Sequence, residues 1–355
     1  MRQHNRARSA GCLVFALLFF EPVSHSRLMS IPSLVAMTQS ASVIVVGEVV
    51  RVDKVGVGDL ANWDGRHYAV NRMVATVRID EVLKGDIASN IIRVEYLENP
   101  DWQSGPLTNA LTEKTYRMLF LKADADRFGF AASEQSSMPM SRNRSALPQP
   151  AGPDVYTRVL QHLAESLFSM EDNSQERVAA VFVLTNEPSP FVTELFKSAL
   201  ADRAAASDPR LRLELLAAIV KRKDKSVLPD LTAELFATQD AKYLNDRGNM
   251  ILALQEVDGA VAAPILIRAL KLPESGLRAT AAEALKRTPA DVAIDALLDA
   301  LNDSDPNAQF QVMEALSFLA KQPHWLPTST TPDASWNTAL DHWKDFATAR
   351  RKTAR

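Results

Sequence analysis

Residues 276–322 contain two copies of one sequence pattern. The ten residues that end at Leu285 (Gly-Leu-Arg-Ala-Thr-Ala-Ala-Glu-Ala-Leu) align with the ten that end at Leu316 (Asn-Ala-Gln-Phe-Gln-Val-Met-Glu-Ala-Leu), 31 positions later. Between the two copies, residues 291–301 carry apolar side chains at i, i+3, i+4 and i+7, which is the spacing of one helix face. A chain with this pattern is predicted to form helix pairs that stack one after another.

The same periodicity extends upstream to residue 154. Five apolar anchors of successive inner helices are spaced 31 to 35 positions apart: Leu184, Ile219, Leu254, Leu285 and Leu316. Asp208-Pro209 and Asp305-Pro306 are typical helix starts, with proline in the first turn. We predict helices at residues 154–169, 174–187, 189–203, 208–222, 227–238, 240–256, 259–271, 275–287, 290–302, 305–321 and 333–350.

The period and the paired alanines (Ala217-Ala218 and Ala281-Ala282) resemble HEAT repeats, including those of the lyase-like class. The resemblance implies an α-solenoid over residues 154–350. Each helix pair of such an array buries its apolar face only against its neighbours, so the array needs closed ends. Trp336, Leu340 and Trp343 lie at i, i+4 and i+7 of the last helix and are expected to form a C-terminal cap. A ligand-binding pair of tryptophans is the alternative.

The N-terminal half shows the pattern of β-strands. We predict strands at residues 42–52, 67–82, 91–97, 115–121 and 127–132, with long polar loops at 53–66 and 98–113. Gly47, inside the first strand, suggests a bulge or a sharp bend. Because no helix separates the strands, the sheet is expected to be antiparallel. A small closed five-stranded β-barrel is the economical way to hide its edges.

The strand sequences resemble bacterial netrin/TIMP-like domains of the OB-fold type. The resemblance is carried by Ser-Ala-Ser-Val-Ile-Val-Val-Gly-Glu-Val, by Ala-Thr-Val-Arg-Ile-Asp-Glu-Val-Leu-Lys-Gly-Asp and by Tyr-Arg-Met-Leu-Phe-Leu-Lys. It implies an OB-like barrel over residues 31–132. The eukaryotic protease inhibitors of that family act through an N-terminal cysteine, which this sequence lacks, so that activity is not carried over. Residues 133–153 hold four prolines and several serines and are predicted to be a linker.

Residues 1–26 have the pattern of a secretory signal. Arg2, Arg6 and Arg8 precede an apolar run from Gly11 to Phe20, which is too short to span a bilayer comfortably. Export to the periplasm or the extracellular space is therefore expected, with an uncleaved inner-membrane anchor as the alternative. Cleavage would remove three arginines and one glutamate, changing the formal net charge from −3 to −5, and would leave no cysteine and no membrane span.

The sequence lacks the common motifs of catalysis. The chain has six histidines, none in a His-Glu-x-x-His spacing, and it lacks the Gly-x-Ser-x-Gly and phosphate-binding glycine motifs. We therefore predict no catalytic residues, no metal and no cofactor. The acidic mature charge argues against nucleic-acid partners, because phosphate binding needs a basic surface.

Two candidate binding surfaces follow from the pattern. If the strands alternate in direction, loops 53–66 and 98–113 emerge at the same barrel end, each with a tryptophan beside an acid: Trp63 and Asp64, and Asp101 and Trp102. Such loops are typical of ligand binding, and packing of each ring onto its own barrel end is the alternative.

The second surface is the concave side of the solenoid, where inner helices carry Arg212, Lys221, Arg278, Lys286 and Arg287. It is either a groove for a protein or an ordinary solvated face.

The expected function is non-catalytic protein–protein interaction or scaffolding in the bacterial cell envelope. A carbohydrate- or small-ligand-binding module that uses Trp63 and Trp102 is the first alternative. A lyase-like HEAT enzyme is the second, although export and the absence of cysteine in the mature chain argue against it. The sequence predicts neither the identity of the protein partner nor the oligomeric state.

Overall fold

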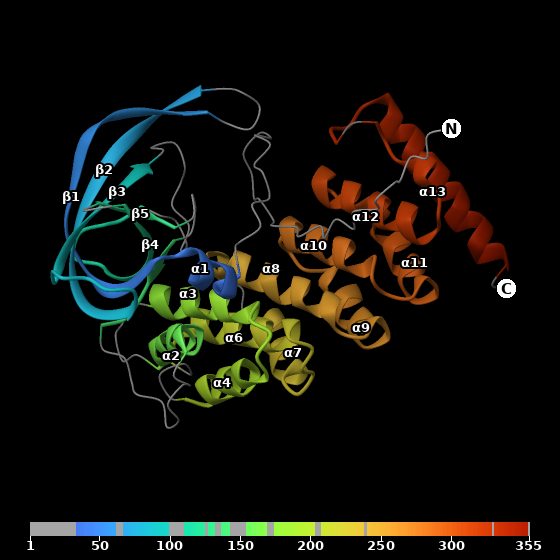
Figure 1. Cartoon of the computed structure of the whole chain (residues 1–355). Coiled ribbons are helices and arrows are strands. Elements are labelled where there is room, and N and C mark those ends of the chain that lie inside the picture. The colour runs from blue at the N-terminus through green and yellow to red at the C-terminus, as the bar shows by residue number, and fades with distance from the viewer. Residues whose placement is uncertain are drawn as a thin grey trace, which may run out of the picture.

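The computed structural model describes residues 33–61, 67–98, 110–124, 127–131, 136–142, 154–168, 174–202, 207–237, 240–328 and 330–353. The predicted signal at residues 1–26 lies outside these ranges. The described chain begins with a short helix, continues through a β-barrel and ends in a stack of helices (Figure 1). The barrel is therefore followed by a helical region, as the sequence predicts.

Five strands close the barrel. They are β1 (Val43–Ala61), β2 (His67–Lys84), β3 (Ile91–Glu98), β4 (Tyr116–Asp124) and β5 (Arg127–Phe130). Their order is β1-β2-β3-β5-β4, and β4 pairs back onto β1. The expectation of a purely antiparallel sheet is wrong in one place, because β5 runs parallel to β3 through Val94–Phe128 and Glu95–Gly129. Only two residues separate β4 from β5, and the two strands pair antiparallel, so β5 can close the barrel on β3 only in the parallel direction.

Strand β1 is much longer than the sequence indicates. The predicted polar loop at 53–66 is wrong for residues 53–61, which pair with β2 as far as Ala61–His67 and form with it a ribbon that β3 joins as far as Asn71. Four register shifts interrupt this pairing, one of them at Gly47 as predicted. A Cβ at Gly47 would lie 2.2 Å from the carbonyl oxygen of Arg78, so only glycine lets the strands approach here. Extra residues at bulges raise the local twist and bend the ribbon.

Part of the stretch predicted to be a linker belongs to the barrel. Within residues 133–153, strand β6 (Ser137–Pro139) pairs antiparallel with β4. Met138 and Met140 are 2% and 1% exposed. Proline at the end of an edge strand costs no ladder hydrogen bond, so Pro139 is compatible with this position.

The helical region has two layers. The inner layer consists of α3 (Ser174–Thr185), α6 (Pro209–Lys221), α8 (Leu244–Ala253), α10 (Ser275–Leu285) and α12 (Pro306–Leu319). The outer layer consists of α4 (Pro190–Ala201), α7 (Leu228–Ala237), α9 (Gly259–Ala269), α11 (Ala290–Asp299) and α13 (Ala334–Thr353). Successive inner helices pack on one another, and the stack runs away from the barrel (Figure 1).

The predicted anchors and helix starts are found in this stack. All five anchors, from Leu184 to Leu316, are fully buried. The side chains of Asp208 and Asp305 cap α6 and α12 by accepting hydrogen bonds from Leu211 and Ala308. Short 3-10 turns complete the connections: η1 (Ala241–Tyr243), η2 (Leu254–Glu256), η3 (Ala300–Asn302) and η4 (Pro323–Trp325).

The barrel and the stack share one hydrophobic core. Helix α1 (Leu34–Ser40) and helix α2 (Val155–Leu167) lie between them. The largest buried cluster joins Ile44 and Phe120 of the barrel to Leu163 of α2 and Val181 of α3. The opposite faces of β1 and β4 fill the barrel interior, where Val45, Val77 and Leu119 are fully buried. The barrel is thus fixed on the first helices by the outer face of its own strands.

Polar contacts reinforce this junction. Arg158 of α2 donates a hydrogen bond of 2.7 Å to the carbonyl of Leu83, at the end of β2. The ring of His162 lies 3.0 Å from the carboxylate of Glu81, also on β2. The Lys84 ammonium donates to the carbonyls of α1, including Thr38 at 2.7 Å, and so holds the C-terminal end of that helix.

The other end of the stack is covered by aromatic side chains of α13. Trp336 and Trp343 are 2% and 0% exposed, and the Trp336 indole donates a hydrogen bond of 2.6 Å to Gln309 on α12. Trp325 packs edge-on against Trp343, with 4.9 Å between ring centroids. These rings face the last inner helix, so they bury apolar surface that a further repeat would otherwise cover.

Candidate functional site

The inner helices carry a row of arginines, called here the arginine ladder: Arg177, Arg212, Arg247 and Arg278. Each lies seven positions before the buried anchor of its helix. Arg177 pairs with Asp208 at 2.9 Å, and Arg247 pairs with Glu274 at 2.5 Å. Both carboxylates occupy the N-cap position of the next inner helix. These two pairs therefore join one repeat to the next. This role was not predicted from the sequence, although the constant offset from the anchors signals it.

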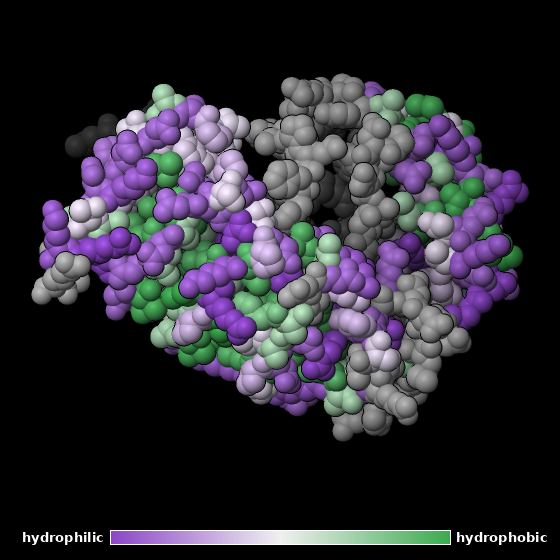
Figure 2. Space-filling view, turned by 180° about the vertical axis from the view of Figure 1, so that it is seen from behind, coloured by the Kyte–Doolittle hydropathy of each residue, from purple (hydrophilic) through white to green (hydrophobic). Residues whose placement is uncertain are grey.

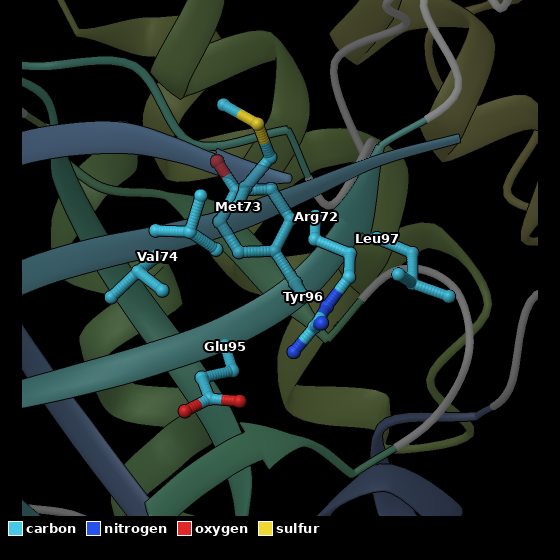
Figure 3. A pocket seen from close by; sticks show the side chains of 7 residues that line it. Arg72, Met73, Val74, Glu95, Tyr96 and Leu97 are labelled. Atoms are coloured by element: carbon cyan, nitrogen blue, oxygen red, sulfur yellow. The ribbon is translucent and has the colours of Figure 1, made fainter. Parts of the chain in front are cut away.

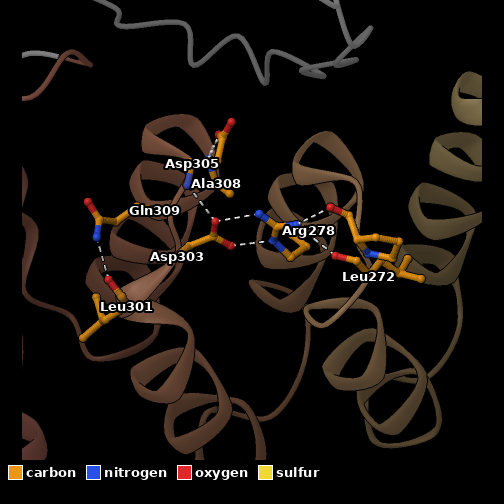
Figure 4. A network of polar contacts seen from close by, with 8 residues as sticks. Leu272, Arg278, Leu301, Asp303, Asp305, Ala308 and Gln309 are labelled. Carbon is orange, nitrogen blue, oxygen red and sulfur yellow. Dashed lines mark hydrogen bonds and ion pairs between the residues drawn. The ribbon is translucent and has the colours of Figure 1, made fainter. Parts of the chain in front are cut away.

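Arg278 makes the most complete set of contacts in the ladder (Figure 4). Its guanidinium binds both carboxylate oxygens of Asp303, at 2.6 and 2.7 Å, and donates to the carbonyls of Leu272 and Pro273. The hydrogen bonds with Arg278 lower the pKa of Asp303, and those with Asp303 raise the pKa of Arg278. Bidentate pairing of this kind fixes geometry as well as charge.

Most cations of the predicted groove are therefore paired with carboxylates of the protein itself. Arg212 pairs with Glu234 of α7 at 2.8 Å, and Lys286 pairs with Glu283 and Glu314. Arg212 and Arg278 are positioning residues of the fold, and their contact with a partner stays a prediction. Arg287 differs, because 59% of its side chain is exposed.

A second row of residues lies at the C-terminal ends of the inner helices, where the side chains are exposed or partly exposed to solvent. We call it the edge row, and its members follow their anchors by two positions: Lys221, Glu256, Arg287 and Phe318. Arg287 and Glu256 lie 3.6 Å apart across neighbouring repeats. Phe318 is 65% exposed, a large apolar ring beside charged groups. The edge row thus offers alternating charge and one aromatic anchor on a rigid array.

Between α6 and α8, two carboxyl groups face each other. Glu214 is hydrogen-bonded to Asp246 and also accepts from the Asn249 amide at 2.9 Å. Asp246 is 3% exposed and occupies the place held by leucine in the neighbouring repeats. Burial, together with the hydrogen bond to Asp246, raises the pKa of Glu214 to about 8. The Arg210 guanidinium, 3.3 Å from Asp246, opposes this rise in the pKa of Glu214.

The barrel has a small pocket on the ribbon side (Figure 3). It has a volume of about 170 Å³, and its lining comes from β1, β2 and β3. Seven residues line it: Val55, Arg72, Met73, Val74, Glu95, Tyr96 and Leu97. Burial raises the pKa of Tyr96 to about 12, so its ring is neutral at physiological pH. No sequence motif points to this pocket, because the shifted register of β1 brings its walls together.

The predicted loop residues Trp63, Asp64, Asp101 and Trp102 lie outside the described part of the chain. The segments that lead to them are described, however. Ala61 ends β1, and Glu98, which pairs with Asn71 of the ribbon, ends β3. The described strands that precede the two loops therefore both end on the ribbon side.

The surface of the helical stack and the potential metal ligands give no further candidate site in the described part of the chain. Figure 2 shows a face on which hydrophobic residues lie between hydrophilic ones over the helical stack. Within the described ranges, no three histidine, cysteine or acidic side chains gather as a metal site would require. None of the helices in those ranges has both the length and the apolar character needed to cross a bilayer.

Comparison with known proteins finds a family resemblance for part of the helical stack. Residues 237–317 match the family model for HEAT repeats. This range covers α8 to α12, the part in which the two aligned copies lie. A search of curated proteins found no match. Residues 237–317 are thus similar to HEAT repeats, and the HEAT-repeat resemblance predicted from the sequence is confirmed over this range.

Proposed function

We propose that this chain is a non-catalytic scaffold of the bacterial cell envelope that binds a protein partner through the edge row. HEAT repeats commonly form such scaffolds, because a stack of helices presents an extended and rigid surface. The export pattern of residues 1–26 supports the envelope location. The strand order of the barrel, with a β4 that returns to β1, supports an OB-type domain.

The observation that carries the proposal is the difference between the arginine ladder and the edge row. The ladder cations are satisfied inside the protein, whereas Arg287 and Phe318 are open to solvent. Interfaces draw most of their binding energy from a few aromatic and arginine side chains. Arg287 and Phe318 occupy equivalent positions on two neighbouring inner helices. Together they give the edge row the residue types that are typical of a protein-binding surface.

Site-specific photo-crosslinking in the native bacterium tests this function. A benzophenone amino acid is placed at Phe318 and, as a matched control, at Val261, which is 44% exposed on outer helix α9. We expect a discrete protein adduct at position 318, none at 261, and loss of the adduct when Lys221→Glu and Arg287→Glu are added. Equal labelling at both positions, or an adduct that survives the charge reversal, would contradict the proposal. N-terminal sequencing of the protein from the periplasmic fraction tests export.

A small-ligand function of the barrel is the second candidate, and the ends of β1 and β3, which both lie on the ribbon side, favour it. The loops with Trp63 and Trp102, which are expected as carbohydrate-binding residues, follow these two strands in the sequence. A glycan array probed with the wild type and with the double W63A/W102A variant separates the two functions. The lyase-like alternative rests on the repeat resemblance alone.

A further inference from the structure

The pocket on the ribbon side, called here the Arg72 pocket, combines an apolar interior with an arginine that has no ion pair within the described part of the chain. Val55 and Leu97 are 52% and 47% exposed at its walls, and Val74 is buried at 5%. Arg72 is exposed, and it forms no hydrogen bond or ion pair with other residues in the described part of the chain. Glu95 on the rim already faces Arg127 at 4.0 Å. The charge left to attract a ligand is therefore positive.

The space beside Arg72 depends on Gly58. A Cβ at that position would lie 3.2 Å from Cγ of Arg72 and 3.5 Å from a methyl carbon of Leu97. The glycine thus lets the arginine stem and the leucine lie close to the ribbon backbone. Figure 3 shows the guanidinium extending between Glu95 and Leu97, at the edge of the apolar wall.

The size of the pocket limits the occupant. Its volume of about 170 Å³ is close to that of an engineered protein cavity of roughly 150 Å³ that accepts benzene. Drug-sized ligands need pockets of at least about 300 Å³. One large side chain fits the volume, and a whole sugar ring with its hydroxyl groups would leave polar groups unpaired against the valines.

We propose that this pocket binds one branched aliphatic side chain of a protein partner, with a neighbouring acidic residue paired to Arg72. The aliphatic group contacts Val55, Val74 and Leu97, and the carboxylate accepts hydrogen bonds from the guanidinium. This inference rests on the proposed partner-binding function and adds a second contact site on the barrel, away from the edge row.

Three capped dipeptides test the proposal on the full chain: acetyl-Leu-Asp-, acetyl-Leu-Asn- and acetyl-Ala-Asp-methylamide. Binding is followed by the methyl NMR signals of Val55, Val74 and Leu97. We expect millimolar binding of the Leu-Asp peptide, roughly fivefold weaker binding of Leu-Asn because an exposed ion pair is lost, and roughly tenfold weaker binding of Ala-Asp.

Variants assign the effect to the pocket. R72Q should abolish the preference for Leu-Asp over Leu-Asn, whereas R93Q, an exposed arginine two positions before Glu95 on β3, should leave it unchanged. G58A should weaken all three peptides by crowding Arg72 and Leu97. Unchanged methyl signals of the barrel interior, such as Val77, show that the variants fold.

Two results would overturn the proposal. One is the absence of pocket shifts at 20 mM peptide, a concentration on the order of ten times the expected dissociation constant. The other is equal binding of the Leu-Asp and Leu-Asn peptides, which would remove the role of the cation. Photo-crosslinking at Phe318 is independent of this pocket, so its outcome distinguishes failure of the inference from failure of the proposed function.

Discussion

The buried carboxylate of Glu187 accepts a hydrogen bond of 3.1 Å from the backbone amide of Leu34, across 153 residues of sequence. Its other oxygen accepts from the Tyr156 hydroxyl at 2.7 Å. One side chain in the α3–α4 connection therefore holds the first residue of α1 and the first turn of α2. Glu187 is 2% exposed, and these donors supply the hydrogen bonds that a buried carboxylate needs.

Removing this carboxylate should weaken the junction of barrel and stack. E187A leaves the Leu34 amide and the Tyr156 hydroxyl without acceptors inside the protein, so we expect a loss of about 3 kcal/mol in the free energy of unfolding. Urea denaturation measures it. The matched control E194A removes a glutamate whose side chain is 74% exposed and should change stability by less than about 0.5 kcal/mol. Equal effects of the two variants would show that the junction does not depend on Glu187.

Two glycines of β1 should respond very differently to alanine. G47A places a methyl group against the Arg78 carbonyl, so we expect a loss of about 3 kcal/mol from forced separation of β1 and β2. Position 56 has no atom within 4 Å of the added Cβ, so G56A should change stability by less than about 0.5 kcal/mol. Thermal unfolding of both variants tests the pair, and a G47A protein as stable as G56A would refute the close approach at the bulge.

Substitutions in the arginine ladder should destabilise the protein much more than substitutions in the edge row. R278M strands the nearly buried carboxylate of Asp303, whose side chain is 8% exposed, and should cost about 2–4 kcal/mol. Adding D303N to R278M should restore part of that loss, because the neutral amide is less costly to bury. R287Q should change stability by less than about 0.5 kcal/mol. A destabilised R287Q protein would place Arg287 among the residues that hold the repeats together.

The Glu214–Asp246 pair should make stability depend on pH. The pKa of Glu214 is about 8 in the folded chain and 4.5 in its ordinary state, so the fold favours the protonated form. The stability from this group is fully present below pH 4.5 and is lost as the pH rises through 8. E214Q stays neutral, so its stability should fall less between pH 5 and pH 9.

Urea denaturation at several pH values gives this slope for the wild type, E214Q and D246N. At pH 9 we expect E214Q to exceed the wild type by on the order of 2 kcal/mol. D246N removes the acidic partner that raises the pKa of Glu214, so its slope should also be shallower. A wild-type slope that persists in E214Q would assign the titration to another group.

The helical half could be predicted almost element by element. Its anchors repeat at 31 to 35 positions, and the aspartates at 208 and 305 mark helix starts through bonds within one turn. The ribbon was missed for a local reason as well. Asp53, Gly56 and Gly58 have the composition of a loop, and only pairing with β2 makes that segment a strand.

The candidate site was less predictable. Arg212 and Arg278 look like surface cations in the sequence, because a helical period shows which face a residue occupies and not which carboxylate it meets. Glu234 and Asp303 are 22 and 25 positions away, on other elements. Likewise, Val55, Arg72 and Leu97 share no local motif, and the register of three strands brings them together.

By itself, the sequence determined the class of each half, the helix boundaries and the buried anchors, because periodicity and caps depend on residues within a few positions of one another. The tertiary structure decided that β1 extends into a ribbon, that residues 137–139 join the barrel, and that Glu187 ties α1 to the stack. It also decided which charged side chains are paired within the protein and which are exposed to solvent. These outcomes depend on contacts between residues tens to hundreds of positions apart, whose free energy is gained only when the whole chain has folded.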